Sequence, residues 1–382
     1  MLDRPDLFQR IKTAIQRSPV TSILGPKQCG KTTVGRMVAD SIPSTYFDLE
    51  NPLDAASLGQ SAMTTFFNSE GLIVIDEIQR QPELFQILRV LADDRERQFK
   101  FLTLGSADPY LVRGTSESLA GRVEFIDMSG FTLEEVGLHE YKKLWIRGGF
   151  PPSYLASDDL SSDVWRQNYL RTFLERDIPQ LGFVIPSETL RRFWTMVAHY
   201  HGRIWNASPF SSSLGLSAQT VRRYLDILTG AYMLRQLAPW FENIKKRQIK
   251  APKFYIRDTG LLHTLLSLNG DAVLTHPMLG ASWEGFIIEQ ILTTLQTHDC
   301  YYWGTHAGAE LDLLIFSKGK KYGFEIKYTD APQKTKSMSI SINDLGLERI
   351  FIVFPGTKSF FLGDNIYALC LQDLLHMLSE LK

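Results

Sequence analysis

Eight consecutive residues near the amino terminus have the types and spacing of a phosphate-binding loop. The run from Gly25 to Thr32, GPKQCGKT, matches G-x-x-x-x-G-K-[ST] in full, between an apolar segment at 20–24 and a helix-like segment. Such a loop turns backbone N–H groups toward phosphates, while the lysine reaches the outer phosphates and the threonine hydroxyl binds Mg²⁺. The motif predicts ATP bound with Mg²⁺, and the alternative is a degenerate, unoccupied loop. The expected nucleotide-binding residues are Gly25, Pro26, Lys27, Gln28, Cys29, Gly30, Lys31, Thr32 and Thr33.

Two acids follow the apolar segment 72–75, Leu-Ile-Val-Ile, at its carboxyl end. In an open parallel sheet, ligands lie outside the carboxyl ends of the strands. We therefore expect Asp76 to hold Mg²⁺ together with Thr32, directly or through water. Glu77 can orient and deprotonate the water that attacks the γ-phosphate, which predicts hydrolysis in addition to binding.

Two further residues are candidates for the same chemistry, beside Lys31 and Glu77. Ser106 ends the strand-like run KFLTLGS and could contact the γ-phosphate or the attacking water, although a structural turn serine explains it equally well. Arg122 follows a glycine and starts another strand-like run. It could act as an arginine finger toward the nucleotide of a neighbouring subunit, and the alternative is a surface or buried ion pair.

A second set of charged residues lies near the carboxyl terminus. Glu310-Leu311-Asp312 and Glu325-Ile326-Lys327 fall on two expected strands joined by the turn SKGKK, and alternation puts the charged residues of each triplet on one face. The pattern resembles the PD-(D/E)xK nuclease core, in which acids bind Mg²⁺ and a lysine positions water. Glu284, on the preceding helix, would be the additional acid. The alternative is a cross-strand ladder of charges on an exposed sheet.

The elements that must position these residues divide the chain into regions. Up to about residue 130, five apolar runs alternate with longer mixed segments, which predicts a parallel α/β sheet: VTSILG, TYFDLE, GLIVIDE, KFLTLGS and VEFIDM. In the chain, TYFDLE lies between the loop and Asp76. This order fits the class of P-loop proteins that inserts a strand between those two in the sheet and uses an adjacent Glu.

Beyond this ATPase region, placed at residues 1–150, the composition changes three times. Residues 151–164 are rich in Pro, Ser and Asp and are expected to form a linker. Residues 165–270 have helical periodicity, including a helix capped by Ser217 with Val221, Leu225 and Leu228 on one face. This helix follows another helix and a Gly turn, as in a winged helix-turn-helix. Residues 271–382 read as a second α/β unit.

Charge is distributed unevenly along the chain. Residues 165–265 carry 15 Lys and Arg against 6 Asp and Glu, although the whole chain has a net charge of -1. A basic segment on an acidic chain favours an anionic partner, with DNA the leading candidate. Alternatively, the segment is a solvated helical surface, a structural lid or a subunit contact. The expected DNA contacts, brought together by a hairpin wing, are Arg222, Arg223, Lys245, Lys246, Arg247 and Lys250.

Composition excludes several classes of protein. No segment approaches the ~18 apolar residues of a membrane span, and the start of the chain lacks the basic and apolar parts of a secretory signal. Cys29, Cys300 and Cys370 lie far apart, without disulfide-framework or zinc spacing. We expect a soluble protein of the reducing cytoplasm with no membrane partner.

Together these stretches resemble a family of two-part bacterial and archaeal ATPases of the AAA-like P-loop superfamily, whose C-terminal part is a domain of unknown function. The resemblance covers nearly the whole chain and rests on GPKQCGKTT, VIDEIQRQPEL, LTLGSA, SLAGR, RGGFPPS, YLRTFLERDI, PKFYIRDTGLL, GAELDLLI and FEIKY. It implies an AAA-like ATPase core, a winged-helix-like middle and a restriction-endonuclease-like C-terminal fold. This chain departs from its relatives at Cys29, where a small or aliphatic residue is usual, and at Phe150-Pro151-Pro152, where an acid often follows the proline.

Three functions follow as hypotheses. The first is a Mg²⁺-dependent ATPase that couples hydrolysis to DNA association or remodelling, and that could form homo-oligomers. The second is a nucleotide-gated switch that binds a protein partner and has a non-catalytic C-terminal domain. The third is an ATP-regulated nuclease. Glu77 and Arg122 discriminate the first two, because binding alone requires neither residue.

Overall fold

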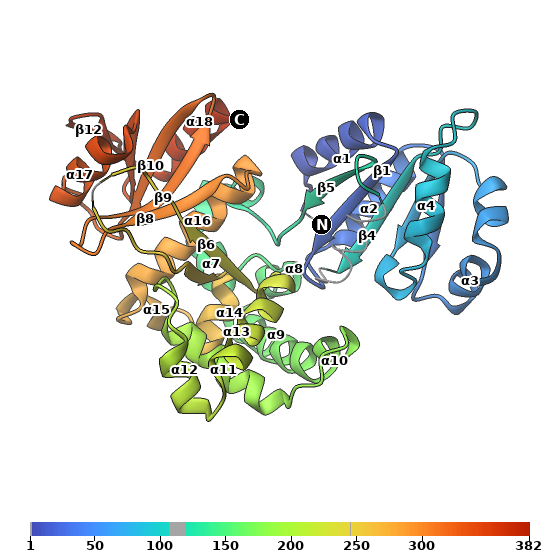
Figure 1. Cartoon of the computed structure of the whole chain (residues 1–382), viewed down its shortest axis with the longest axis horizontal. Coiled ribbons are helices and arrows are strands. Elements are labelled where there is room, and N and C mark those ends of the chain that lie inside the picture. The colour runs from blue at the N-terminus through green and yellow to red at the C-terminus, as the bar shows by residue number, and fades with distance from the viewer. Residues whose placement is uncertain (1, 107–118, 245) are drawn as a thin grey trace. The chain divides into compact units, whose positions relative to one another are not determined.

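The computed structural model describes residues 2–106, 119–244 and 246–382. By contacts between residues the chain divides into two compact units (Figure 1). The first runs from the amino terminus to Gly130 and includes Gly230–Tyr232, and the second comprises Phe131–Thr229 and Met233–Lys382. Each unit is described by itself.

The first unit is built on a five-stranded parallel sheet, as the alternating apolar runs predict. Its strands are β1 (Val20–Gly25), β2 (Ser44–Asp48), β3 (Leu72–Asp76), β4 (Phe101–Ser106) and β5 (Val123–Asp127), in the order β2-β3-β4-β1-β5. Strands β1, β3 and β4 are buried along their whole length, whereas the edge strands β2 and β5 are half-buried. This explains the continuous apolar runs of the central strands, because helices cover both faces of parallel sheets.

One strand is indeed inserted between the loop strand β1 and the acidic strand β3. It is β4, however, and not β2, the strand that lies between them in the chain. Sequence order could not reveal this, because parallel strands are joined by crossovers that need not place consecutive strands side by side. The helices of this unit are α1 (Pro5–Arg17), α2 (Lys31–Ser41), α3 (Pro52–Phe67) and α4 (Leu84–Ala92), with a 3-10 turn, η1 (Ile78–Arg80).

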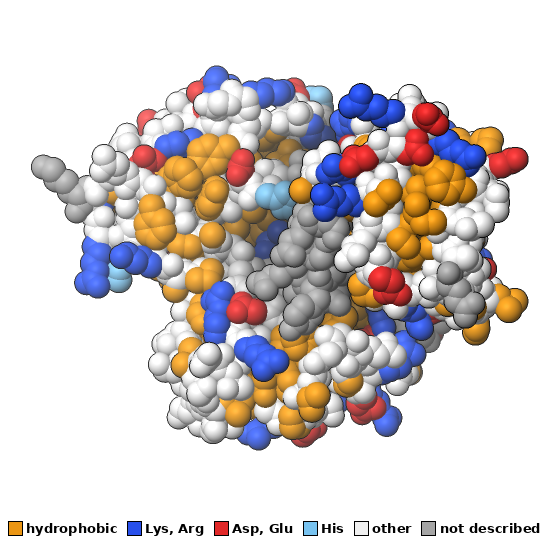
Figure 2. All heavy atoms as spheres, turned by 45° about the vertical axis from the view of Figure 1, so that its right-hand side comes forward, with side chains coloured by type: hydrophobic (Ala, Val, Ile, Leu, Met, Phe, Trp, Pro, Cys, Tyr) orange, Lys and Arg blue, Asp and Glu red, His pale blue; other side chains and the backbone are white. Residues whose placement is uncertain are grey.

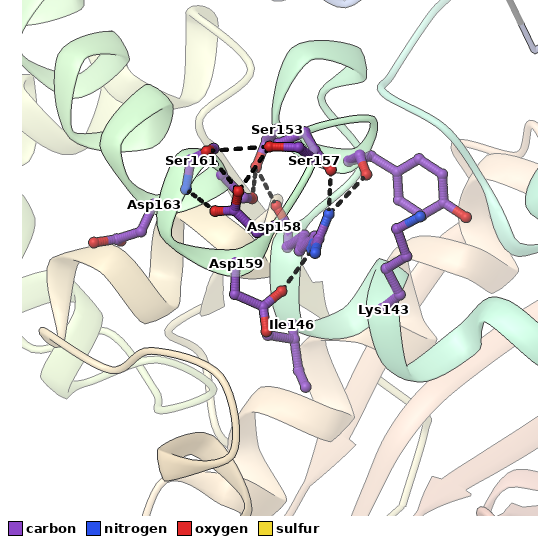
Figure 3. A network of polar contacts seen from close by, with 12 residues as sticks. Lys143, Ile146, Ser153, Ser157, Asp158, Asp159, Ser161 and Asp163 are labelled. Atoms are coloured by element: carbon purple, nitrogen blue, oxygen red, sulfur yellow. Dashed lines mark hydrogen bonds and ion pairs between the residues drawn. The ribbon is translucent and has the colours of Figure 1, made fainter.

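The segment expected to be a linker, 151–164, is helical. It forms α8 (Pro151–Tyr154) and the first turns of α9 (Asp159–Thr172). The expectation was wrong because the residues that disfavour helix interiors also begin helices. Two prolines start α8, and the carboxylate of Asp158 accepts a hydrogen bond from the backbone N–H of Ser161 at 2.7 Å, as a helix cap (Figure 3).

The second unit continues with helices. They are α6 (Leu133–Val136), η2 (Leu138–Glu140) and α7 (Tyr141–Arg147) before α8, and after α9 η3 (Phe173–Asp177), α10 (Ile178–Gln180), α11 (Ser187–His199), α12 (Ala207–Leu214) and α13 (Ala218–Gly230). The hydroxyl of Ser217 accepts a hydrogen bond from the N–H of Thr220 at 3.1 Å, which confirms the expected cap of α13. Val221, Leu225 and Leu228 are fully buried, which confirms the expected apolar face.

An eight-stranded sheet forms the rest of the second unit. The strands are β6 (Leu234–Pro239), β7 (Lys253–Ile256), β8 (Cys300–Gly304), β9 (Glu310–Ser317), β10 (Lys320–Ile326), β11 (Arg349–Val353), β12 (Phe360–Gly363) and β13 (Ile366–Leu369). Their order is β12-β13-β11-β10-β9-β8-β6-β7. The helices that accompany them are α14 (Thr259–Leu265), α15 (Ala272–Thr275), α16 (Leu279–Leu295), α17 (Lys336–Leu345) and α18 (Leu371–Leu381).

The hairpin β6–β7 belongs to this sheet, because β6 pairs with β8 at Ala238–Tyr301 and Pro239–Tyr302. The sheet therefore contains strands from both sides of the border expected at residue 270. The hairpin adds two strands to one edge of the sheet, and a pattern of local periodicity carries no information about such a distant pairing.

Two glycines fix a close approach between α7 and α14. A Cβ atom at Gly260 would lie 2.2 Å from the carbonyl oxygen of Arg147, and one at Gly148 would lie 2.2 Å from Oδ1 of Asp258. The carboxylate of Asp258 accepts hydrogen bonds from the N–H groups of Gly149 at 2.7 Å and Leu261 at 2.9 Å. The RGGFPPS and RDTGLL stretches therefore interlock through backbone contacts that admit no side chain.

Among the described residues, no helix is both long enough and apolar enough to cross a membrane.

Replacing Gly260 by alanine should destabilise the protein, since its Cβ cannot coexist with the Arg147 carbonyl at the present separation. We expect Gly260→Ala to lower the unfolding free energy by about 1–3 kcal/mol, as overpacking does. Gly280→Ala is the matched control, because no atom lies within 4 Å of its Cβ position at the start of α16. Urea unfolding followed by tryptophan fluorescence measures both, and equal midpoints for Gly260→Ala and the parent would contradict the interlock.

Candidate functional sites

The phosphate-binding loop connects β1 to α2 with left-handed backbone at two positions. Gln28 has φ +64° and Gly30 has φ +102°, immediately before Lys31 begins α2. A Cβ atom at Gly25 would lie 2.1 Å from the carbonyl oxygen of Met128, so only glycine fits at the end of β1. Cys29 is buried. The loop thus follows a buried strand and precedes a helix, as the motif requires.

Lys31 is held within this loop. Its side chain is buried, and its ammonium donates hydrogen bonds to the carbonyl oxygens of Gly25 at 3.1 Å and Pro26 at 2.8 Å. These carbonyls partly compensate the cost of burying the charge. The ammonium is therefore positioned at the point where β1 ends, beside the N-terminus of α2.

Asp76 is fixed by two hydrogen bonds at the end of β3. Its Oδ2 accepts from the hydroxyl of Tyr46 at 2.7 Å and its Oδ1 accepts from the N–H of Glu77 at 2.9 Å, and the residue is 1% exposed. Burial and the neighbouring Asp76 raise the pKa of Tyr46, which keeps its hydroxyl a donor. Sequence reasoning missed Tyr46. Its position in a strand that pairs with β3 was the signal, but it required knowing the pairing.

Glu77 has left-handed backbone, with φ +56°, and its carboxylate accepts a hydrogen bond from the side-chain amide of Gln79. Burial raises the pKa of Glu77, an effect that the nearby Lys31 opposes and Asp76 reinforces. A carboxylate with increased proton affinity is suited to accept a proton from water. Gln79 is a second residue that sequence reasoning missed, although it lies only three residues after Asp76.

Ser106 reaches this group from β4. Its N–H donates a hydrogen bond to the side-chain carbonyl of Gln79 at 3.2 Å, so Gln79 links Glu77 to the end of β4. The register pairs Ser106 with Gly25. Its buried hydroxyl has no hydrogen-bond partner in the described part of the chain, which leaves a polar atom free for a ligand near the loop.

The donors available here fit Mg²⁺. The buried carboxylate of Asp76 and the half-buried hydroxyl of Thr32 are hard oxygen ligands. Among residues 2–106, 119–244 and 246–382, no group of three or more His, Cys, Asp or Glu side chains is arranged to hold a metal ion.

Arg122 lies where the strands of the same sheet begin, at the opposite end from the phosphate-binding loop. Its carbonyl accepts a hydrogen bond from the N–H of Val20, at the start of β1, whereas the loop begins at the other end of that strand, roughly 17 Å away. Its guanidinium forms two hydrogen bonds with Asp93, at 2.6 and 2.8 Å. Arg122 therefore takes part in the ion pair that was the alternative to a finger.

The four C-terminal candidates come together in the second unit. Glu284 projects from α16, Asp312 from β9 and Glu325 from β10, while Lys327 follows β10. Nζ of Lys327 lies 2.9 Å from Oε2 of Glu325 and 3.4 Å from Oδ2 of Asp312. Asp312 and Glu325 are each only 5% exposed, so the alternative of a solvent-exposed charge ladder is wrong.

Lys253 on β7 completes this cluster and was missed from the sequence. Its ammonium lies 3.5 Å from Oε1 of Glu284, 3.7 Å from Oδ1 of Asp312 and in contact with Glu310, and the residue is 4% exposed. The hydroxyl of Tyr255 donates to Oε1 of Glu284 at 2.6 Å. The signal available in the sequence was a lysine in the otherwise apolar strand KFYI. A lysine in a buried strand needs an acidic partner, because lysine is almost never buried without one.

The pKa values of the buried acids and of the lysines in the cluster are all raised, for different reasons. Burial, reinforced by Asp312, raises the pKa of Glu284 to about 7 and that of Glu325 to about 8. Burial alone would lower the pKa of Lys253, but Tyr255 and the surrounding carboxylates raise it. The two lysines thus stay charged, while protons compete with them for the acids at neutral pH.

The expected DNA contacts are divided between two places. Arg222 and Arg223 lie on α13, where Arg222 pairs with Asp226 at 3.1 Å and Arg223 lies over the ring of Phe183. Lys246 pairs with Asp344 of α17 at 2.6 Å. Arg247 and Lys250 lie on the segment between β6 and β7, and Lys245 lies outside the described residues.

The expectation that a hairpin wing brings these basic residues together is therefore wrong, because Ile249 is hydrogen-bonded to Gly304 of the C-terminal sheet and Lys246 pairs with Asp344 of α17, whereas Arg222 and Arg223 lie on α13. On the face drawn in Figure 2, blue basic side chains are scattered among acidic and uncharged groups without forming one continuous patch.

Comparisons with known proteins match the chain along its length. Three family profiles match consecutive parts: an AAA domain at residues 17–137, a domain of unknown function (DUF8612) at 138–272 and a domain of unknown function (DUF4143) at 279–374. Two mycobacterial proteins, Uncharacterized protein Rv2008c of Mycobacterium tuberculosis and Uncharacterized protein Mb2031c of Mycobacterium bovis, are each 48% identical over 376 residues. The match covers 98% of this chain and 85% of each of theirs.

Solved structures give weaker likenesses. The Walker-type ATPase paby2304 of Pyrococcus abyssi is 14% identical with a TM-score of 0.44, and the match covers 70% of this chain and 96% of that one. The RuvB Holliday junction branch migration motor of Thermotoga maritima is 17% identical with a TM-score of 0.29, covering 62% of this chain and 90% of that one.

Stability should depend on pH through the buried acid cluster. A carboxyl whose pKa is raised by folding binds more protons in the folded state than in the unfolded state. Its contribution to the free energy of unfolding therefore falls as the pH rises from its unfolded pKa to its folded pKa. We expect the parent to lose stability relative to Glu325→Gln between about pH 5 and pH 8, by up to about 1.4 kcal/mol per pH unit. Urea unfolding across this range measures the difference.

The matched control for that measurement is Glu348→Gln, on the same sheet but exposed and paired with Lys320. It should follow the parent through this pH window, because its pKa is lowered and not raised. If the free energies of unfolding of the parent and of Glu325→Gln changed in parallel with pH, Glu325 would be ionised in the folded protein at neutral pH.

Proposed function

The chain belongs to the family of the two mycobacterial proteins, with an AAA domain followed by a C-terminal DUF4143 domain, and from that premise we propose that it binds ATP with Mg²⁺ and hydrolyses it. The proposal rests on one observation, which is that Lys31, Asp76, Glu77 and Ser106 lie together at the carboxyl ends of the central strands of a parallel sheet. The AAA match spans all four residues.

Each residue has one task in this proposal. The loop N–H groups and Lys31 would bind the phosphates, and Thr32 and Asp76 would hold Mg²⁺, whose charge would stabilise the phosphoryl oxygens. Glu77 accepts a proton from the attacking water, and Gln79 keeps its carboxylate oriented. The hydroxyl of Ser106 contacts the terminal phosphate or the water.

Glu77 separates hydrolysis from binding. Lys31→Ala should abolish nucleotide binding, whereas Glu77→Gln should bind ATP like the parent and lose at least about a hundredfold in turnover, as expected for a missing general base. Phosphate release and binding of a fluorescent ATP analogue measure the two properties. Glu83→Gln, an exposed residue in the same stretch, is the control and should leave both unchanged.

If Glu77→Gln hydrolysed ATP at the parental rate, the proton would have another acceptor. The chain would then fit the alternative of a slow, nucleotide-gated switch that holds a protein partner with a non-catalytic C-terminal domain. In that case the release of a bound partner, and not phosphate production, would report on nucleotide.

Arg122 can serve a nucleotide only in a neighbouring copy. Arg122 lies beside the start of β1, and the loop of its own subunit lies at the end of that strand. A finger role therefore requires a homo-oligomer, in which Arg122 exchanges its pair with Asp93 for a phosphate. The same arginine otherwise remains a structural link between α4 and β5.

Association with DNA is the second part of the proposal. The order α11, α12, α13, β6, β7 fits a winged-helix-like module, and α13 would be its recognition helix. Its basic residues, Arg222 and Arg223, would contact the duplex, and Arg222 would have to exchange its partner Asp226 for a phosphate. The segment 246–250 is bonded to the sheet, so it does not act as a free wing in this proposal.

A specific observation favours a second activity, cleavage of phosphodiesters by the C-terminal cluster. Lys327 lies within ion-pair distance of both Asp312 and Glu325, and Lys253 links Glu284 of α16 to Asp312. As they lie, these described acids are not arranged to hold a metal ion, so they would have to rearrange to bind a divalent cation, which would polarise the phosphate while Lys327 would orient water. Here a cation would compete with the Lys253 ammonium for Glu284 and Asp312.

Cleavage is tested by incubating the protein with labelled DNA or RNA and Mg²⁺ or Mn²⁺. Asp312→Asn and Lys327→Gln should each abolish cleavage, because one loses a ligand and the other the group that positions water. Lys320→Gln changes an exposed lysine of the same sheet and should cleave like the parent. Cleavage that persists in both cluster variants would come from a contaminant.

A further inference from the structure

A cavity of about 580 Å³ lies beside the C-terminal sheet, and most of the residues that line it belong to the segment between β6 and β7. The described residues that line it include Phe241, Arg247, Ile249, Lys250 and His306. None of the described lining residues is acidic. The cavity therefore has a mainly apolar lining, with Phe241 and two basic residues among its members, and it lies outside both sites described above.

Backbone hydrogen bonds hold one wall of this pocket. The N–H of Ile249 donates to the carbonyl of Gly304 at 3.0 Å, and the N–H of His306 donates to the carbonyl of Arg247 at 2.9 Å. These bonds form a short antiparallel bridge with the end of β8. The positions of Arg247 and His306 are thus set by the sheet, as a binding site requires.

The side chains offer two kinds of contact. Phe241 is 51% exposed, an unusual position for a large aromatic ring. Arg247 and Lys250 are exposed and form no ion pair with any described residue, in contrast to Arg222 and Lys246. An aromatic ring stacks on a nucleobase, and unpaired cations bind the phosphates on either side of it.

We propose that this pocket binds one nucleotide of a single-stranded nucleic acid. The base stacks on Phe241, and Arg247 and Lys250 bind the flanking phosphates. The volume of this pocket lies within the range of roughly 300–1,000 Å³ that is usual for ligand sites. The pocket would accept an unstacked base, which a duplex does not offer. The inference deepens the DNA association proposed above by naming a different surface and a single-stranded ligand.

The pocket also adjoins the acid cluster. Gly304 pairs with Glu310 across β8 and β9, and Glu310 contacts Lys253. Lys253 in turn follows Lys250 by three residues along the chain.

The test uses the full chain, a fluorescein-labelled oligo(dT) of about 20 nucleotides and fluorescence anisotropy, in EDTA and without nucleotide. Phe241→Ala should weaken binding about five- to a hundredfold through lost stacking. Arg247→Gln combined with Lys250→Gln should reduce the slope of log K against log salt by about 1.4, the value for two phosphate contacts on a single strand.

The matched control is Arg191→Gln combined with Arg192→Gln, which removes two exposed cations from α11 and should leave oligo(dT) binding unchanged. Arg222→Gln combined with Arg223→Gln is measured in parallel with a duplex of the same length and tests association through α13, so the two proposals fail separately. Circular dichroism and the melting temperature confirm that each variant is folded.

The pocket is not the site if the parent fails to bind oligo(dT), or if folded pocket variants bind it with parental affinity and salt dependence. An equal loss for single strand and duplex would mean a general basic surface and would also overturn the proposal.

Discussion

Burying a charged group at the end of a strand is costly unless a partner compensates it, and this constraint shapes both units. In the first unit Lys31 is compensated by carbonyl oxygens of its own loop, and Asp76 by a tyrosine hydroxyl and a backbone N–H. In the second, Asp312 and Glu325 share Lys327. The residues available for chemistry are in each case those that the sheet has already desolvated and oriented.

What could be predicted from the sequence followed from local patterns. The loop from Gly25 to Thr32, the acids after β3 and the cap of α13 are defined by neighbours a few residues away, and the structure has each in the expected element. The convergence of Glu284 with Asp312 and Glu325 was also anticipated, through resemblance to a known arrangement of strands. The roles of these residues in chemistry stay predictions.

What could not be predicted depends on pairing between distant segments. Lys253 joins the acid cluster only because β7 folds back beside β6, and Tyr46 reaches Asp76 only because β2 pairs with β3. The basic count of the middle region was equally silent about geometry, since Arg222 and Lys246 each have an acidic partner within the chain. Composition records how many charges there are, and the fold decides which of them remain available.

The hairpin β6–β7 has a consequence for how such a chain can be inherited. Because it supplies Lys253 and two edge strands to a sheet that is otherwise encoded after residue 299, the middle and C-terminal segments share one structural element across their boundary. A recombination event that exchanged the C-terminal segment alone would separate Glu284, Glu310 and Asp312 from the ammonium of Lys253 and leave the edge of β8 unpaired. The two segments should therefore evolve as one hereditary block, whatever changes the P-loop unit undergoes.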